Sequence, residues 1–106
     1  MEEIKITKDN FKEEILDKND LVLAEFYSNF CVPCKMLSGI LDKVEQSESE
    51  NVKVVRYEID ENTELAKSCG VLSVPTMIIY KNGVEAEKIN GFRNYNVLVE
   101  TLKKYY

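Results

Sequence analysis

A chain of 106 residues has room for one domain, and its 44% hydrophobic and 31% charged residues are typical of an ordered globular protein. We therefore expect a single domain over residues 1–106. A net charge of −5 argues against binding to nucleic acid or to an anionic membrane surface, because both need basic residues. The start of the chain lacks a basic, apolar leader, and the apolar run 21–24 is too short to span a bilayer. These features predict a cytoplasmic protein.

The N-terminal part of the chain alternates strand and helix patterns. Residues 4–7 (IKIT) indicate a short strand. Thr7 and Asp9 offer capping oxygens to a helix whose apolar residues share one side, namely Phe11, Ile15 and Leu16. Residues 21–27 (LVLAEFY) are apolar on both parities except at Glu25, which predicts a central strand covered on both faces.

The middle of the chain continues this alternation. A helix beginning at the cysteine pair 31/34 carries an apolar stripe at helical spacing, made of Leu37, Ile40, Leu41 and Val44. Residues 52–59 have the pattern of a second buried strand. A short helix over residues 64–68 should end at Gly70, a natural residue for a helix C-terminus.

The last third of the chain predicts a β-hairpin and a closing helix. Asn82-Gly83 is a strong two-residue turn signal between a core strand over residues 76–80 and a charged edge strand over residues 84–89. Asn94 can cap a final helix with an inward face of Tyr95, Leu98, Leu102 and Tyr105. The whole pattern predicts an α/β fold, with a central mixed sheet of about five strands flanked by four helices.

Cys31 and Cys34 stand between the central strand and the helix that follows it. Two cysteines three residues apart at a helix start can close a small, reversible disulfide ring. The unpaired N–H groups and the positive dipole end of the helix favour a thiolate at Cys31. Pro33 lies in the first turn, where its missing N–H has no cost, and stiffens the pair.

Two other interpretations of the cysteine pair are weaker. A zinc or iron–sulfur site needs four ligands, whereas this chain has three cysteines and no histidine. Two inert core cysteines are also an option, but a helix entry beside a proline is a poor place for them. A C-x-x-C pair beside a βαβ pattern in a cytosolic chain favours redox chemistry, with no metal.

Residues 24–35 (AEFYSNFCVPCK) closely resemble the active-site region of the thioredoxin family. Val74-Pro75-Thr76, Lys81-Asn82-Gly83 and Gly91 resemble further family motifs at the expected distances, and the resemblance extends from Phe11 to the last helix. It implies the thioredoxin fold and a monomeric protein-disulfide reductase that needs no bound cofactor. It also implies two kinds of partner, a thioredoxin reductase and disulfide-containing client proteins, and roles in electron transport and cell redox homeostasis.

The resemblance assigns chemical roles to individual residues. Cys31 becomes the exposed nucleophile, and Cys34 the more buried cysteine that resolves the mixed disulfide. Glu25 occupies the position of a buried family Asp, where it would take a proton from Cys34. Alternatively, Glu25 is a structural acid paired with Arg56, which matches a family position usually held by Lys and would modulate the site.

The resemblance also predicts a docking surface for clients. Pro75 matches the family's cis-proline, although without the resemblance a trans proline at a strand start is the better interpretation. A client segment would pair with the backbone of Val74 as an added strand. The residues expected to contact substrate are Phe30, Val32, Pro33, Val74, Pro75 and Gly91.

Four positions depart from the family pattern. Phe30 and Tyr27 replace tryptophans, Val32 replaces a glycine, and Glu25 replaces the aspartate. The first three should affect partner contacts more than chemistry. The third cysteine, Cys69, is either a small buried packing residue or a regulatory thiol.

Three competing functions stay open on the sequence alone. Oxidising or isomerising relatives usually carry a histidine between the cysteines, where this chain has Val32 and Pro33. A non-catalytic binding module is a second alternative, because fold alone does not imply function. A small metal chaperone is the third, weakened by the missing ligands.

Overall fold

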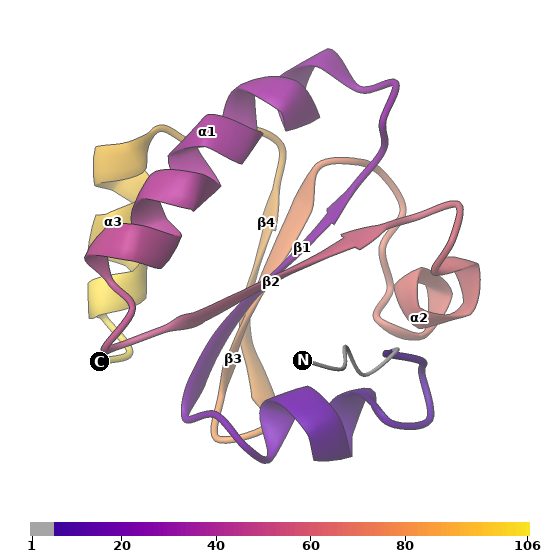
Figure 1. The fold of residues 1–106 in the computed structure, drawn as a ribbon, viewed down its shortest axis with the longest axis horizontal. Helices are drawn as coiled ribbons and strands as arrows, with labels where there is room; N and C mark the ends of the chain where they lie inside the picture. The colour runs from indigo at the N-terminus through magenta and orange to yellow at the C-terminus, as the bar shows by residue number, and fades with distance from the viewer. Residues whose placement is uncertain (1–5) are drawn as a thin grey trace.

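The computed structural model describes residues 6–106 and places four strands and four helices in that range (Figure 1). In chain order the elements are η1 (Lys12–Leu16), β1 (Leu21–Tyr27), α1 (Val32–Ser47), β2 (Lys53–Glu58), α2 (Thr63–Ser68), β3 (Thr76–Lys81), β4 (Val84–Asn90) and α3 (Tyr95–Lys103). The predicted α/β alternation is confirmed. The expected strand over residues 4–7 falls mostly outside the described residues, and its described part, residues 6 and 7, is not in a strand.

The sheet formed by the described strands has the order β2-β1-β3-β4. Strands β1 and β2 are parallel, whereas β1 with β3 and β3 with β4 are antiparallel, so the sheet is mixed as predicted. Strand β1 is buried from Leu21 to Phe26, which confirms a central strand covered on both faces. Strand β2 lies at an edge of this four-stranded sheet and is only partly buried, although its sequence resembles a core strand.

The hairpin between β3 and β4 forms where the sequence predicts it. Asn82 and Gly83 have φ angles of 52° and 82°, and a two-residue turn with both residues in this region matches the right-handed twist of the strands. Strand β4 is the second edge of the described sheet. Its charged side chains suit that position, because charge on an edge strand discourages pairing with other chains.

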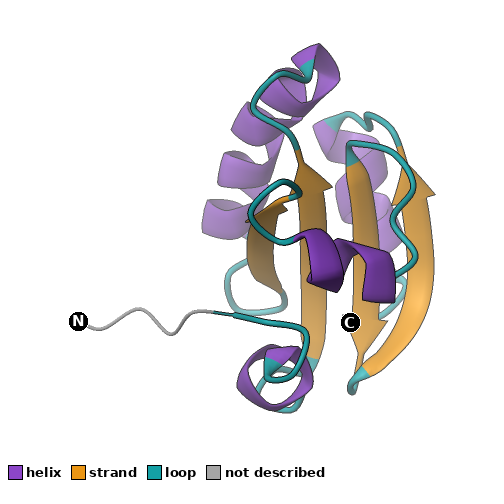
Figure 2. Cartoon of the chain, turned by 90° about the vertical axis from the view of Figure 1, so that its right-hand side faces the viewer, coloured by secondary structure: helices purple, strands orange, loops and turns teal. Residues whose placement is uncertain are grey.

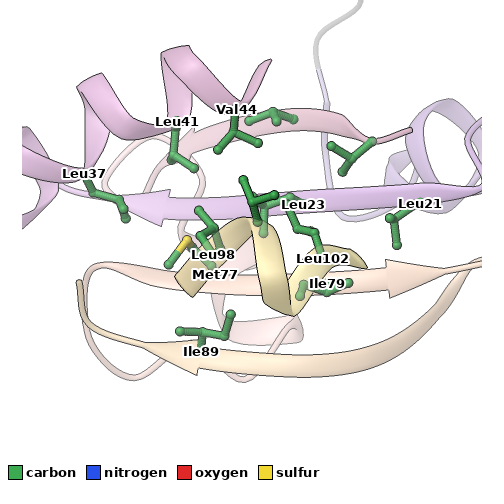
Figure 3. Packing of buried hydrophobic residues seen from close by; sticks show 13 residues of the cluster. Leu21, Leu23, Leu37, Leu41, Val44, Met77, Ile79, Ile89, Leu98 and Leu102 are labelled. Carbon is green, nitrogen blue, oxygen red and sulfur yellow. The ribbon is translucent and has the colours of Figure 1, made fainter. Parts of the chain in front are cut away.

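Helices cover both faces of the sheet (Figure 2). Helices α1 and α3 pack on one face, and Figure 3 shows Leu37, Leu41 and Val44 of α1 pointing towards the strands beside Leu98 and Leu102 of α3. These five side chains are fully buried, so both predicted helical stripes are confirmed. None of the helices in residues 6–106 has the length and apolar character needed to cross a membrane.

The opposite face is covered by η1 and α2 and contains an aromatic cluster that the sequence pattern does not reveal. The Phe11 ring meets the rings of Tyr57 and Tyr80 edge-on, with centroid distances of 5.7 and 5.6 Å. Edge-to-face contacts of this kind add to the stabilisation that burial alone supplies. The cluster joins η1 to both β2 and β3.

Of the two predicted helix caps, the one on α3 is present and the one on η1 is absent. The side chain of Asn94 accepts a hydrogen bond from the Val97 N–H at 3.0 Å, which confirms the cap of α3. The expected side-chain caps from Thr7 and Asp9 are wrong, because no side chain caps η1. Instead, the Thr7 carbonyl accepts from the Phe11 N–H at 2.9 Å, and the Asn10 side chain turns back onto the Thr7 N–H at 2.7 Å.

Candidate active site

Three segments far apart in the sequence meet at one end of the sheet. Because β1 pairs antiparallel with β3 and β3 antiparallel with β4, the chain leaves β1, enters β3 and leaves β4 at the same end. Cys31, Pro75 and Gly91 lie in these three segments. The Gly91 N–H donates a hydrogen bond to the Pro75 carbonyl at 2.8 Å, which ties two of them together. The topology therefore brings the predicted site residues to one place.

Cys31 and Cys34 form a disulfide at the N-terminus of α1, with their Cα atoms 5.2 Å apart. Cys31 is the N-cap residue, and its Sγ accepts a hydrogen bond from the Cys34 N–H at 3.2 Å. Pro33 lies in the first turn, as predicted. Cys31 is half-buried, whereas Cys34 is only 4% exposed, so the two sulfurs differ in access to a partner molecule.

The backbone around Cys31 suits a negatively charged sulfur. A thiolate is a stronger hydrogen-bond acceptor than a thiol or a disulfide sulfur, and the Cys34 N–H already points at this atom. The first turn of α1 adds the positive end of the helix dipole. Together they stabilise the nucleophilic form of Cys31 once the disulfide is reduced.

Glu25 lies in β1, buried beneath this pair. It is 2% exposed, and its Oε2 atom has no hydrogen-bond partner. Burial raises the pKa of Glu25 from 4.5 to about 7, and the positive charge of Arg56 partly opposes that shift. Glu25 and Cys34 line the same cavity of ≈ 160 Å³, together with Tyr27, Lys35, Ser38 and Arg56.

The raised pKa of Glu25 predicts a specific pH dependence of stability. A carboxyl group whose pKa is higher in the folded state does not lower the free energy of unfolding below pH 4.5. Above that pH it lowers the free energy of unfolding increasingly, until the pH passes about 7. We expect Glu25→Gln to be more stable than the unmodified protein by about 3 kcal/mol above pH 8, with the difference vanishing near pH 4. Urea unfolding of both oxidised proteins from pH 4 to 9 measures it. A constant difference across this range would contradict the assignment.

Arg56 is the Cα partner of Glu25 on the neighbouring strand β2, as the sequence suggests. Its guanidinium group nevertheless forms ion pairs with Asp42 at 2.7 Å and Glu45 at 3.7 Å. It also donates a weak hydrogen bond to the Ser38 hydroxyl at 3.4 Å. In residues 6–106, all ion pairs of Arg56 are therefore directed to α1, and the alternative of a direct Glu25–Arg56 pair is not what the structure contains.

The residues expected to contact substrate differ in exposure. Phe30 is 90% exposed, and Val32 is 67% exposed at the start of α1. Pro33 is also exposed, Val74 and Gly91 are half-buried, and Pro75 is buried. The Val74–Pro75 peptide bond is cis, which confirms the prediction made from the family resemblance.

Leu72 is a surface residue that the sequence patterns did not single out, and it is 98% exposed. It lines a groove of ≈ 380 Å³ beside Val74, bordered on the other side by residues of α2. The sequence contains a feature that could have identified it, because Leu72 is a large apolar residue in the aperiodic segment between Gly70 and Pro75.

Cys69 lies apart from this end of α1. It is a free, half-buried cysteine that packs against the aromatic face of the sheet. The Tyr80 hydroxyl donates a hydrogen bond to its Sγ at 3.5 Å. These contacts fit the expectation of a packing residue.

Comparison with known proteins identifies the family to which this chain is similar. The model of the thioredoxin family matches residues 2–104. Thioredoxin of Listeria monocytogenes is 37% identical over 94% of this chain and 95% of its own length, and Thioredoxin 1 of Nostoc sp. is 34% identical over 94% of each. The solved structure of a mutant thioredoxin from Halobacterium salinarum superposes with a TM-score of 0.80 and 32% identity, over 87% of this chain and 80% of that one.

The sheet, its helices and the disulfide at the start of α1 define a protein thiol–disulfide oxidoreductase with the thioredoxin fold. The chain belongs to the thioredoxin family. Membership implies protein-disulfide reductase activity, disulfide-containing substrates and a reductase that regenerates the dithiol.

Proposed function

We propose that this chain acts as a monomer in the cytoplasm, forms one domain, and reduces client disulfides through Cys31 as attacking and Cys34 as resolving sulfur. A thioredoxin reductase then supplies two electrons that return the pair to the dithiol. The observation that carries the proposal is the unequal access of the two sulfurs at the helix N-terminus, half-buried Cys31 against 4% exposed Cys34.

The reaction takes two exchange steps. In the first, the Cys31 thiolate attacks one sulfur of a client disulfide, which forms a mixed disulfide and expels the other client sulfur as a thiolate. In the second, the Cys34 thiolate attacks the Sγ atom of Cys31, which breaks the mixed disulfide and expels the second client sulfur. The client gains two electrons, and this chain is left with the Cys31–Cys34 disulfide present in the structure.

Glu25 is the proposed proton acceptor for the second step. Burial disfavours the charged form of the Cys34 thiol, so its attack needs a base at hand. Glu25 lines the cavity that Cys34 also lines, and a pKa of about 7 means that it takes and returns a proton readily at neutral pH. The cavity has room for water, which can bridge the carboxyl group and the sulfur.

Clients dock across the end of the sheet. The backbone of half-buried Val74 is available to pair with an extended client segment, which brings main-chain hydrogen bonds close to the cysteine pair. Exposed Phe30, Val32 and Pro33 supply apolar contact, and half-buried Gly91 and buried Pro75 shape the neighbouring segments at this end of the sheet. An apolar rim around a reactive sulfur suits a protein substrate.

The reduction potential of the Cys31–Cys34 pair tests the reducing direction. Val32 and Pro33 bring no positive charge between the sulfurs, so we expect a two-electron midpoint near about −270 mV, measured by thiol trapping in dithiothreitol and glutathione buffers. A midpoint above roughly −200 mV would instead indicate an oxidant or isomerase. A pair that does not titrate at all would leave a non-catalytic binding module. Cys69→Ser is the matched control and should leave the midpoint unchanged.

A further inference from the structure

Arg56 lies on the strand next to Glu25, yet its guanidinium group forms ion pairs with carboxylates of α1 and not with Glu25. The two residues are Cα partners on parallel strands, so their side chains leave the same face of the sheet from backbones about 5 Å apart. An arginine so close to a carboxylate commonly forms a short, two-pronged ion pair with it. Here the guanidinium group faces α1, and Glu25 Oε2 is left without a hydrogen-bond partner.

Two carboxylates on α1 hold the guanidinium group in this place. Asp42 and Glu45 are three residues apart, so they are neighbours on the surface of the helix. Their side chains are 63% and 54% exposed, against 24% for Arg56. The pair therefore draws the arginine charge towards the solvent side of the cavity, away from Glu25.

We propose that Asp42 and Glu45, here called the α1 carboxylate pair, are positioning residues of the redox site. By holding the Arg56 guanidinium against α1, they prevent it from closing onto Glu25 and leave this carboxyl group free to exchange a proton with Cys34. This inference rests on the proposed role of Glu25.

Besides Arg56, the residues that line the cavity include one other cation, Lys35. The titratable or charged groups there, besides Glu25 itself, are Tyr27 of β1, Cys34 and Lys35 of α1, and Arg56 of β2. The Cα partner of Glu25 on β3 is the uncharged Met77. Lys35 is exposed, so Arg56 is the cation whose position decides the field at Glu25.

Loss of the α1 carboxylate pair should change the proton affinity of Glu25. A cation in direct contact favours the ionised form of a carboxyl group and lowers its pKa by about 1–3 units. Once released, Arg56 can make that contact. Glu25 would then be ionised throughout the neutral range and would be a weaker base for Cys34.

The test is a carbon-13 NMR titration of the Glu25 carboxyl group in the oxidised protein, with Glu25→Gln used to assign the signal. We expect Asp42→Asn/Glu45→Gln to lower its pKa by about one unit or more. Asp9→Asn/Glu100→Gln is the matched control, since it removes the same charge from exposed positions that are not among the ion-pair partners of Arg56. If both double variants titrate alike, the proposal is wrong.

A second background separates an effect through Arg56 from a direct one. Removing two negative charges near Glu25 lowers its pKa slightly even without any movement of the arginine. On an Arg56→Gln background, the same Asp42→Asn/Glu45→Gln change should therefore give less than half the shift. Equal shifts on both backgrounds would mean that the carboxylates act on Glu25 directly, which overturns the positioning role.

Kinetics distinguish failure of this inference from failure of the proposed function. The rate at which Cys34 resolves a preformed mixed disulfide on Cys31 is followed against pH in the same variants. We expect the midpoint of that profile to move to lower pH together with the Glu25 titration. If the titration moves and the profile does not, the positioning of Arg56 stands and the role of Glu25 as proton acceptor is overturned.

Discussion

Replacing Cys34 by serine is expected to stop turnover and to leave Cys31 joined to a client protein by a disulfide. Cys31 is half-buried and keeps its place at the N-terminus of α1, so the first exchange still proceeds. The serine hydroxyl cannot attack the Cys31 sulfur, so the second exchange is lost. Turnover should fall at least about 10³-fold, as when one essential group of a covalent mechanism is removed.

Non-reducing electrophoresis against a model protein with one accessible disulfide measures the adduct, and a dithiol reductant should release it. Cys31→Ser is the matched control and should form no adduct, because Cys34 is only 4% exposed. An adduct formed by Cys31→Ser and absent from Cys34→Ser would reverse the two assigned roles.

Replacing one buried leucine of α1 by alanine should strongly lower the free energy of unfolding. Leu41 is fully buried in the cluster between α1, α3 and the sheet, so Leu41→Ala removes apolar contacts and leaves a cavity. Such changes cost about 2–5 kcal/mol. That is a large part of the roughly 5–15 kcal/mol by which a typical domain is stable, and urea unfolding at pH 7 measures it.

Met36→Ala on the same helix provides the control. Met36 is 58% exposed, so its loss should change the free energy of unfolding by no more than about 0.5 kcal/mol. Comparable losses for Leu41→Ala and Met36→Ala would contradict the assignment of the inward face of α1.

Periodic patterns made most of the fold predictable from the sequence. The apolar run of β1, the stripe on α1 and the Asn82-Gly83 turn each carry a local signal with one structural solution, and each is confirmed. The position of β2 at the edge of the sheet formed within residues 6–106 was not predictable in this way. Its apolar residues resemble those of a core strand, and the pairing order that places it at the edge depends on the whole sheet.

Two features of the candidate site were predictable from the sequence, whereas its side-chain geometry was less so. The spacing of Cys31 and Cys34 predicted the disulfide, and the family resemblance predicted the cis bond before Pro75. The ion-pair partners of Arg56 were missed. A long, flexible arginine has several carboxylates within reach, and its choice among them is decided by helix packing that no local pattern encodes.

The cap of the first helix was missed for a related reason. Thr7, Asp9 and Asn10 all carry oxygens suited to capping, and the sequence alone does not rank them. The turn over residues 8–10 brings the Asn10 amide against the Thr7 N–H, so a side chain closes the turn and a backbone carbonyl begins the helix.

The exposed residues around the cysteine pair can change during evolution without loss of the fold. Phe30 and Val32, two of the positions that depart from the family pattern, are 90% and 67% exposed. Substitutions there remove no packed contact from either core, so selection can alter them one at a time without compensating changes beneath. On the docking surface proposed above, such substitutions would change partner choice while the sheet and the sulfur chemistry stay as they are.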